Sequence, residues 1–220
     1  MKAFKILTGI LFGVLGTCVL FVFFDKLIFN KERKLVALNS PVQLYSGDII
    51  FQTSKSRQSM AIQLATKSKY SHVGILYDSN GQYYVYEAVQ PVKFTKLNDW
   101  IRRGKDGHYL IKRLKGSKLS AESIRKRNSV GREFLGKNYD LYFEWSDSRI
   151  YCSELVWKIY KEALNLEVGR LQELQDFDLK SDAVKTKLME RYGKVIPLHE
   201  KVISPVAIFN SYKLITVTER

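Results

Sequence analysis

The chain has 220 residues and a net charge of +14, which is enough length for one domain with a sizeable core. Its aromatic content of 13%, its 4 prolines and its lack of any internal repeat exclude disordered, collagen-like and solenoid proteins. With only 2 cysteines, a disulfide-stapled scaffold and a multi-cysteine zinc site are excluded as well.

An apolar segment lies close to the N-terminus. The run from Ile6 to Phe24 carries no charge and is long enough to cross a bilayer as a helix. It ends in bulky residues, whereas cleavage of a signal peptide requires small ones. We therefore expect residues 1–25 to form a transmembrane anchor, with a cleaved signal peptide or a lipidated Cys18 as the alternatives.

Residues 26–40 are charged and polar, and they predict a tether to a soluble domain over residues 41–220. More cations follow the apolar segment than precede it, so the positive-inside rule taken literally keeps this domain in the cytoplasm. A short basic stretch before a single apolar segment, here Lys2 and Lys5, is nevertheless how exported proteins usually begin. We expect a membrane-anchored protein whose soluble domain is extracytoplasmic.

The sequence of the first half of the soluble domain predicts short strands, one helix and a hairpin. Apolar residues recur at helical spacing over residues 59–67. Asp78-Ser-Asn-Gly81 separates two β-rich runs and is a strong hairpin signal. The predicted strands are residues 48–52, 73–77, 83–86 and 108–114.

The second half is richer in helical patterns. Residues 115–137 predict a basic helix, and residues 152–164 predict an amphipathic helix with one apolar stripe. Residues 166–192 are charged and helical at their end, and residues 202–217 have strand character, with Pro205 at a turn or strand start. Helices and antiparallel strands without alternating β-α-β units predict an α+β fold.

Cys152 stands at the start of the predicted helix 152–164. A thiol at a helix N-terminus lies at the positive end of the helix dipole, which favours the thiolate. The free N–H groups there can also stabilise the oxyanion of an acyl intermediate. Taken alone, such a cysteine is more often a small buried residue of a core helix.

His72 and Glu87 lie on the two strands of the predicted hairpin. With a loop over residues 78–81, His72 faces Glu87 directly; with a turn centred on Asn80-Gly81, Glu87 is the diagonal neighbour on the same face. In either register the carboxylate can orient the imidazole and stabilise its cation, an arrangement used for nucleophilic attack on a carbonyl. An exposed cross-strand pair is the alternative, and spacing alone does not bring Cys152 to His72.

Five short motifs follow one another along the chain. They are Gly47-Asp-Ile-Ile-Phe-Gln52, Tyr70-Ser-His-Val-Gly-Ile75, Tyr86-Glu-Ala88, Asn138-Tyr-Asp140 and Tyr151-Cys-Ser-Glu-Leu155. In this order the sequence resembles the permuted papain-like NlpC/P60 cysteine hydrolases of the YiiX-like branch, over about residues 42–217. The resemblance implies a circularly permuted papain-like α+β domain with an antiparallel sheet and a nucleophile helix. The permutation explains why the histidine precedes the cysteine.

The resemblance also implies roles for single residues. Cys152 matches the nucleophile, His72 the general base and Glu87 the residue that orients the histidine. The candidate substrate-binding residues are Ser71 and Tyr151, which flank these positions, and Tyr139 and Asp140 of the motif Asn138-Tyr-Asp140. The implied reaction is attack on an amide or ester carbonyl to give a thioester, with no metal and no other cofactor.

Several substrates fit this chemistry. The first hypothesis is hydrolysis of amide bonds in cell-wall peptides or small aminoacyl amides. The second is a lipid-directed acyltransferase or phospholipase, because an anchored basic domain is attracted to an anionic membrane surface. The third is a non-catalytic binding domain that uses residues 115–137. Nucleic-acid binding is not expected, because the basic residues follow no nucleic-acid-binding module.

The shape of the pocket at Cys152 would separate the first two hypotheses. A narrow polar cleft with an acidic residue near the thiol suits an amine-bearing peptide. A wide apolar groove suits an acyl chain.

Overall fold

Residues 42–116 and 119–220 are described by the computed structural model of this protein. Within them, Leu44–Arg220 belong to one compact unit. The expected anchor and tether lie outside the described residues. No helix in the described ranges is both long enough and apolar enough to cross a membrane.

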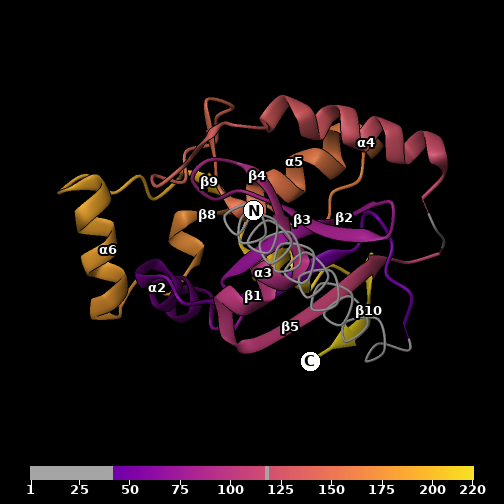
Figure 1. The fold of residues 1–220 in the computed structure, drawn as a ribbon. Helices are drawn as coiled ribbons and strands as arrows, with labels where there is room; N and C mark the ends of the chain where they lie inside the picture. Colours follow the sequence, from indigo (N-terminus) through magenta and orange to yellow (C-terminus); the bar gives the residue numbers. More distant parts are fainter. Residues whose placement is uncertain (1–41, 117–118) are drawn as a thin grey trace, which may run out of the picture. The chain divides into compact units, whose positions relative to one another are not determined.

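A six-stranded antiparallel sheet is the central element of this unit (Figure 1). Its strand order is β10-β5-β1-β2-β3-β4, so the predicted hairpin β2–β3 lies next to β1. The strands are β1 (Ile49–Ser54), β2 (His72–Ser79), β3 (Gln82–Glu87), β4 (Lys93–Lys96), β5 (Gly104–Leu114) and β10 (Leu214–Glu219). The α+β class with an antiparallel sheet is confirmed.

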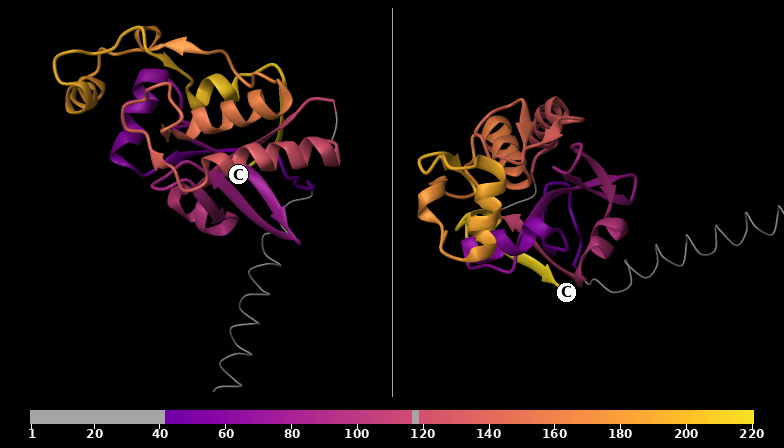
Figure 2. Two further views of the ribbon diagram at one scale, coloured as in Figure 1. Left: turned by 90° about the horizontal axis from the view of Figure 1, so that it is seen from above. Right: turned by 90° about the vertical axis from the view of Figure 1, so that its left-hand side faces the viewer.

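Helices cover both faces of the sheet (Figure 2). Successive strand residues point to opposite faces, so Phe51 packs with α5 in one core, while Ile50 packs with Trp100 of α3 in the other. The helices of these two layers are α3 (Leu97–Arg103), α4 (Ala121–Phe134), α5 (Cys152–Leu164) and α7 (Pro205–Phe209). Burial on both faces explains why the central strands read as nearly continuous apolar runs.

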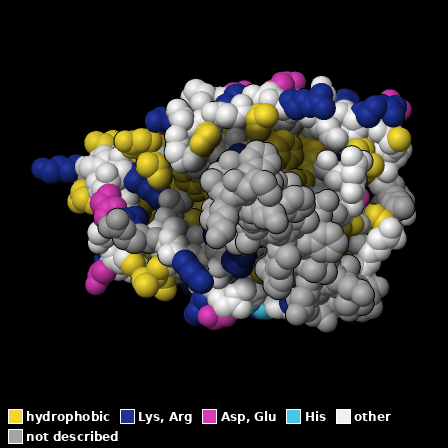
Figure 3. Space-filling view, in the orientation of Figure 1, with side chains coloured by type: hydrophobic (Ala, Val, Ile, Leu, Met, Phe, Trp, Pro, Cys, Tyr) yellow, Lys and Arg dark blue, Asp and Glu magenta, His cyan; other side chains and the backbone are white. Residues whose placement is uncertain are grey.

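Two further helices, α2 (Arg57–Thr66) and α6 (Asp182–Tyr192), lie side by side at the end of the sheet. They enclose a third, smaller apolar cluster that includes Ala61, Val184 and Leu188. The space-filling view shows hydrophobic side chains among Lys and Arg over this part of the molecule (Figure 3). The remaining short elements are β6 (Asn138–Tyr139), β7 (Arg149–Ile150), β8 (Gln172–Glu173), η1 (Leu174–Asp176) and β9 (Lys201–Val202).

The β2–β3 hairpin adopts the second of the two predicted registers. Asp78 pairs with Tyr83 and Ser79 with Gln82, so the turn consists of two residues. Asn80 and Gly81 both have positive φ angles, 53° and 81°, as a two-residue turn of this hand requires. Strands 48–52 and 108–114 and helices 59–67 and 152–164 are confirmed to within a few residues at each end.

Two predictions from the sequence were incomplete. Pro205 starts helix α7 rather than a strand: the Ser204 Oγ accepts a hydrogen bond from the Ala207 N–H, and proline at the first helical position has no N–H to satisfy. Strand character begins only at Leu214.

Strand β4 and helix α3 were not predicted, because both are short and neither shows a sustained period.

Gly74 of β2 allows the strand to pack closely on β3. A Cβ at this position would lie 2.4 Å from Val85 Cγ1 and 2.9 Å from the Tyr86 carbonyl oxygen. Since the backbone oxygen cannot move without disturbing the sheet, we expect Gly74→Ala to destabilise the fold by about 1–3 kcal/mol. Gly131→Ala is the control, because the three atoms nearest its added Cβ all belong to side chains, the closest being the Tyr77 hydroxyl at 3.2 Å. Thermal melting should separate the two variants; equal melting temperatures would contradict this account.

Candidate active site

Cys152 is the first residue of α5 and is 3% exposed. The Tyr151 carbonyl accepts the first helical hydrogen bond, from the Leu155 N–H at 3.0 Å. The Tyr151 N–H itself donates to Glu154 Oε2 at 3.4 Å. The first N–H groups of a helix have no acceptor within the helix, so the Cys152 N–H is free to bind an oxyanion next to its own sulfur.

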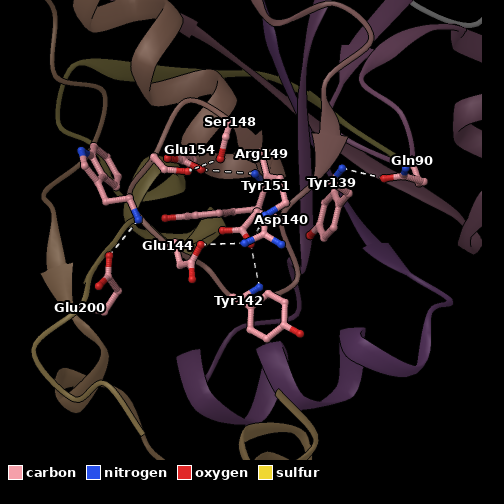
Figure 4. A network of polar contacts seen from close by, with 12 residues as sticks. Gln90, Tyr139, Asp140, Tyr142, Glu144, Ser148, Arg149, Tyr151, Glu154 and Glu200 are labelled. Atoms are coloured by element: carbon pink, nitrogen blue, oxygen red, sulfur yellow. Dashed lines mark hydrogen bonds and ion pairs between the residues drawn. The ribbon is translucent and has the colours of Figure 1, made fainter. Parts of the chain in front are cut away.

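Buried polar contacts hold this helix start in place, and Figure 4 shows two of the residues that make them, Tyr151 and Glu154. The Ile203 N–H donates to the Tyr151 hydroxyl at 3.0 Å, and the Ser153 hydroxyl donates to the Ile203 carbonyl at 2.7 Å. Glu154 pairs with Lys158 at 2.9 Å, and its burial raises the pKa of the carboxyl to about 8. Cys152 is thereby held in place through both of its neighbours in the chain.

His72 and Glu87 are in direct contact. His72 Nε2 lies 2.6 Å from Glu87 Oε2, with the carboxyl fully buried and the imidazole 12% exposed. His72 is the first residue of β2 and Glu87 is the last of β3, so the diagonal placement expected from the hairpin is realised. The Trp100 ring stacks on the imidazole with centroids 5.8 Å apart.

Glu87 accepts three further hydrogen bonds. Trp100 Nε1 donates to Oε2 at 2.9 Å, Thr95 Oγ1 donates to Oε1 at 2.5 Å, and the Arg103 guanidinium pairs with Oε1. Burial alone would raise the pKa of Glu87, but the contact with His72, together with Thr95 and Arg103, lowers it to about 2. The carboxylate is therefore ionised at any ordinary pH. Sequence reasoning missed these partners because they lie on β4 and α3.

His72 also interacts with Cys152. Burial alone would lower the pKa of His72, but hydrogen bonds to Cys152 and Glu87 outweigh it and raise the pKa to about 9. Because Glu87 occupies Nε2, the other ring nitrogen, Nδ1, is left for the sulfur. The imidazole is thus cationic at neutral pH and lies between a carboxylate and the thiol.

An apolar pocket of about 90 Å³ opens on Cys152. Its walls come from α2, α6 and the segments around η1 and β9. Its apolar lining includes Ile62, Ala65, Phe143, Leu174, Val184 and Leu188. Among the described residues that line it, Lys187 and Arg191 are charged and none is acidic. The side of the site that holds the sulfur therefore suits an apolar group.

A larger cleft of about 680 Å³ lies on the imidazole side. It is lined by His72, by the apolar side chains of Ala88, Val89 and Leu141, and by polar and cationic side chains, among them Gln52, Lys55, Ser56, Gln90 and Arg103. Three residues line both spaces: Gln58, Ile62 and Tyr139. A reacting group between sulfur and imidazole would lie where the two spaces meet.

Tyr139 is the substrate-binding candidate that lines both spaces. Gln58 Nε2 donates to its hydroxyl at 3.1 Å, which leaves the hydroxyl proton free to be donated into the site. Burial and the neighbouring charge of Cys152 raise the pKa of Tyr139, so the hydroxyl keeps that proton. Gln58 had not been identified from the sequence, since helix periodicity does not show which polar residue faces a cleft.

The other candidates lie differently. Tyr151 lines the apolar pocket, and Ser71 lines the polar cleft. The Ser71 hydroxyl is already engaged, since it accepts from the Ser54 N–H at 2.9 Å and lies 2.6 Å from the Ser59 hydroxyl. Asp140 is fully buried and lines neither space; its carboxylate accepts from the Tyr142 N–H at 2.8 Å.

The contact with Glu87 predicts how His72 titrates. Glu87→Gln removes the negative charge that stabilises the imidazolium, so the pKa of His72 should fall below about 9. The chemical shifts of ¹⁵N-labelled histidine, followed against pH, measure this directly. Glu173→Gln is the control, because Glu173 pairs with the exposed His199 at 2.9 Å. An unchanged His72 midpoint in Glu87→Gln would contradict the assignment.

The same raised pKa affects stability in a defined pH window. The folded value of about 9 lies above the ordinary 6.5, so the stabilisation that it brings is complete below about pH 6.5 and is lost as the pH rises through about 9.

Comparisons with known proteins show the family of this chain. A model of the family described as "Permuted papain-like amidase enzyme, YaeF/YiiX, C92 family" matches residues 43–218. YiiX of Escherichia coli (strain K12) is 52% identical over 177 residues, which cover 80% of this chain and 87% of that protein. A crystal structure described as metalloprotein yiiX from Escherichia coli O157:H7 superposes with a TM-score of 0.78 at 52% identity, over 81% of this chain and 98% of that one. The chain therefore belongs to the permuted papain-like amidase family of YaeF and YiiX, and it is a thiol-dependent amidohydrolase.

Proposed function

We propose that this protein hydrolyses amide bonds whose acyl half is apolar, with Cys152 as nucleophile, His72 as acid and base, and Glu87 as the residue that orients the imidazole. The observation that carries the proposal is the apolar pocket at Cys152, since the acyl half of the substrate becomes bonded to the sulfur. The His72–Glu87 contact of 2.6 Å supplies the oriented imidazole.

The first step forms the covalent bond. The Cys152 thiolate attacks the carbonyl carbon, a C–S bond forms, and the π electrons of the C=O bond move to the oxygen. The Cys152 N–H and the Tyr139 hydroxyl are the donors available to this oxyanion. The N-terminal end of α5 adds a favourable dipole at the same place.

The second step releases the amine. The C=O bond re-forms, the C–N bond breaks, and the nitrogen keeps the electron pair and takes the proton from His72 Nδ1. The acyl group remains on sulfur as a thioester. Water then attacks the thioester while His72 takes up its proton, and the carboxylic acid leaves as the thiolate is regenerated.

The lining of the pocket favours an apolar acyl group over an amine-bearing cell-wall peptide. A cationic amine would require an acidic partner, and no carboxylate is present among the described residues that line either space. Membership of an amidase family favours an amide over the ester bonds of a phospholipase substrate. The proposed substrate thus keeps the amide bond of the first hypothesis and takes an apolar acyl chain.

The related crystal structure described as a metalloprotein raises the question of a metal. Among the described residues, no three His, Cys, Asp or Glu side chains group so that they could hold a metal ion. His72 Nε2 is engaged by Glu87 and Nδ1 faces the sulfur. The donor set does not fit a metal centre, and no step of the proposed reaction passes through one.

Hydrolysis of p-nitroanilides by the full-length chain tests the proposal. The rate should rise from the acetyl to the butanoyl and hexanoyl anilide, because each added methylene can be buried in the apolar pocket. Mass spectrometry of the acidified reaction should find the acyl group on the peptide that contains Cys152. Cys152→Ala and His72→Ala should abolish turnover.

Tyr139→Phe should lower kcat by about 10²-fold, as expected for loss of one oxyanion donor. Tyr142→Phe makes the same chemical change at a residue that lines neither pocket, and should leave the rate unchanged. If the rate does not depend on the length of the acyl chain, the proposed preference for an apolar acyl group is wrong. If no thioester forms on Cys152, the proposed mechanism is wrong.

The pH profile of kcat/KM is expected to have an alkaline limb near pH 9. His72 has to carry the proton that it gives to the leaving amine, and this proton is lost as the pH rises through its pKa of about 9. Below that value the imidazolium persists, so the rate should not fall between pH 7 and 8. A decline in kcat/KM centred near pH 6.5 would mean that the His72 imidazole titrates without the influence of Glu87 and Cys152.

A further inference from the structure

The cleft on the imidazole side has a one-sided charge. Lys55 and Arg103 line it together with His72, which is cationic below its pKa of about 9. No Asp or Glu is found among the described residues that line it. The amides of Gln52 and Gln90 and the hydroxyl of Ser56 add polar groups, and the rest of the wall is apolar, with Ala88, Val89 and Leu141. A space so lined is suited to an anion.

We propose that this cleft binds an anionic group carried by the amine half of the substrate: a primary amine whose short substituent ends in a carboxylate, sulfonate or phosphate. The inference rests on the proposed amide hydrolysis and names the leaving group of that reaction.

The placement follows from which residues line which space. Cys152 lines only the apolar pocket, and His72 lines only the polar cleft. The carbonyl carbon bonds to sulfur and the leaving nitrogen takes its proton from the imidazole, so the scissile bond bridges the two. Gln58 and Tyr139, which line both spaces, mark the junction. The acyl half therefore enters the pocket and the amine half enters the cleft.

The cations of the cleft are not neutralised by its own carboxylates. Glu87 pairs with both His72 and Arg103, and the Cys152 thiolate of the proposed mechanism is the second anion beside these two cations. Lys55 is exposed in the loop between β1 and α2 and forms no ion pair with any described residue. The charge of Lys55 thus remains unbalanced in the cleft that receives the leaving nitrogen, where it would attract an anionic substituent.

A matched set of hexanoyl amides tests the proposal on the full-length chain. The leaving amines are glycine, taurine and O-phosphoethanolamine, which are anionic, ethanolamine, which is neutral, and N,N-dimethylethylenediamine, which is cationic. We expect kcat/KM to be at least about threefold higher for an anionic amide than for the neutral one, and lowest for the cationic one. The order among the three anions then shows whether carboxylate, sulfonate or phosphate fits best.

Charge-reversal variants distinguish the effect of the cleft from that of the overall charge of +14, which attracts any anion. Lys and Arg are spread widely over the face drawn in Figure 3. Lys55→Glu should remove or invert the preference for anionic amides. Lys126→Glu makes the same change in net charge on the exposed surface of α4, away from both pockets, and should keep the preference.

A second measurement needs no turnover. Iodoacetate and iodoacetamide alkylate Cys152 by the same displacement but differ in charge, so the ratio of their rates reports the potential at the site. Lys55→Glu should lower the iodoacetate-to-iodoacetamide ratio at least about threefold relative to wild type, and Lys126→Glu should not.

The two measurements keep the proposals apart. If no amide is cleaved but the alkylation ratio responds to Lys55, the amide hydrolysis fails and the anion-binding cleft stands. Equal kcat/KM for neutral and anionic amides, or equal effects of Lys55→Glu and Lys126→Glu on both measurements, would overturn the cleft assignment.

Discussion

The Glu87 carboxylate is the interaction on which the site depends. It is fully buried and accepts hydrogen bonds from His72, Thr95, Trp100 and Arg103, which lie on β2, β4 and α3. A buried charge is tolerated only when its lone pairs are satisfied, so these elements must converge on it for the fold to be stable. The orientation of the His72 imidazole and the packing of α3 on the sheet consequently depend on the same carboxylate.

The reacting groups approach each other from different parts of the architecture. The histidine and its carboxylate sit at the end of a hairpin, whereas the cysteine begins a helix that packs on the sheet. This division gives the two halves of a substrate different surroundings. An apolar wall lies on the sulfur side, and a polar, cationic wall lies on the imidazole side.

The parts of the site that depend on local patterns were predictable from the sequence. The period of two in β2 and β3 and the Asn80-Gly81 turn place Glu87 on the face of His72, and helix amphipathicity places Cys152 at the start of α5. Trp100 and Arg103 were not predicted, because a seven-residue helix carries too little periodicity. The contacts of α2 with α6 join segments that are far apart along the chain. Because no local sequence pattern encodes such contacts, neither pocket could be predicted from the sequence.

Helix α2 has a consequence for how this enzyme can diversify. Gln58 and Ile62 lie one turn apart on it and touch both spaces, so an exchange at either position alters recognition of the acyl and amine halves together. Val184 and Leu188 of α6 touch only the apolar pocket, and Lys55 touches only the polar cleft. On the proposed assignment, related enzymes can therefore change one half of their specificity independently through α6 or the loop before α2, whereas an exchange at Gln58 or Ile62 is doubly constrained.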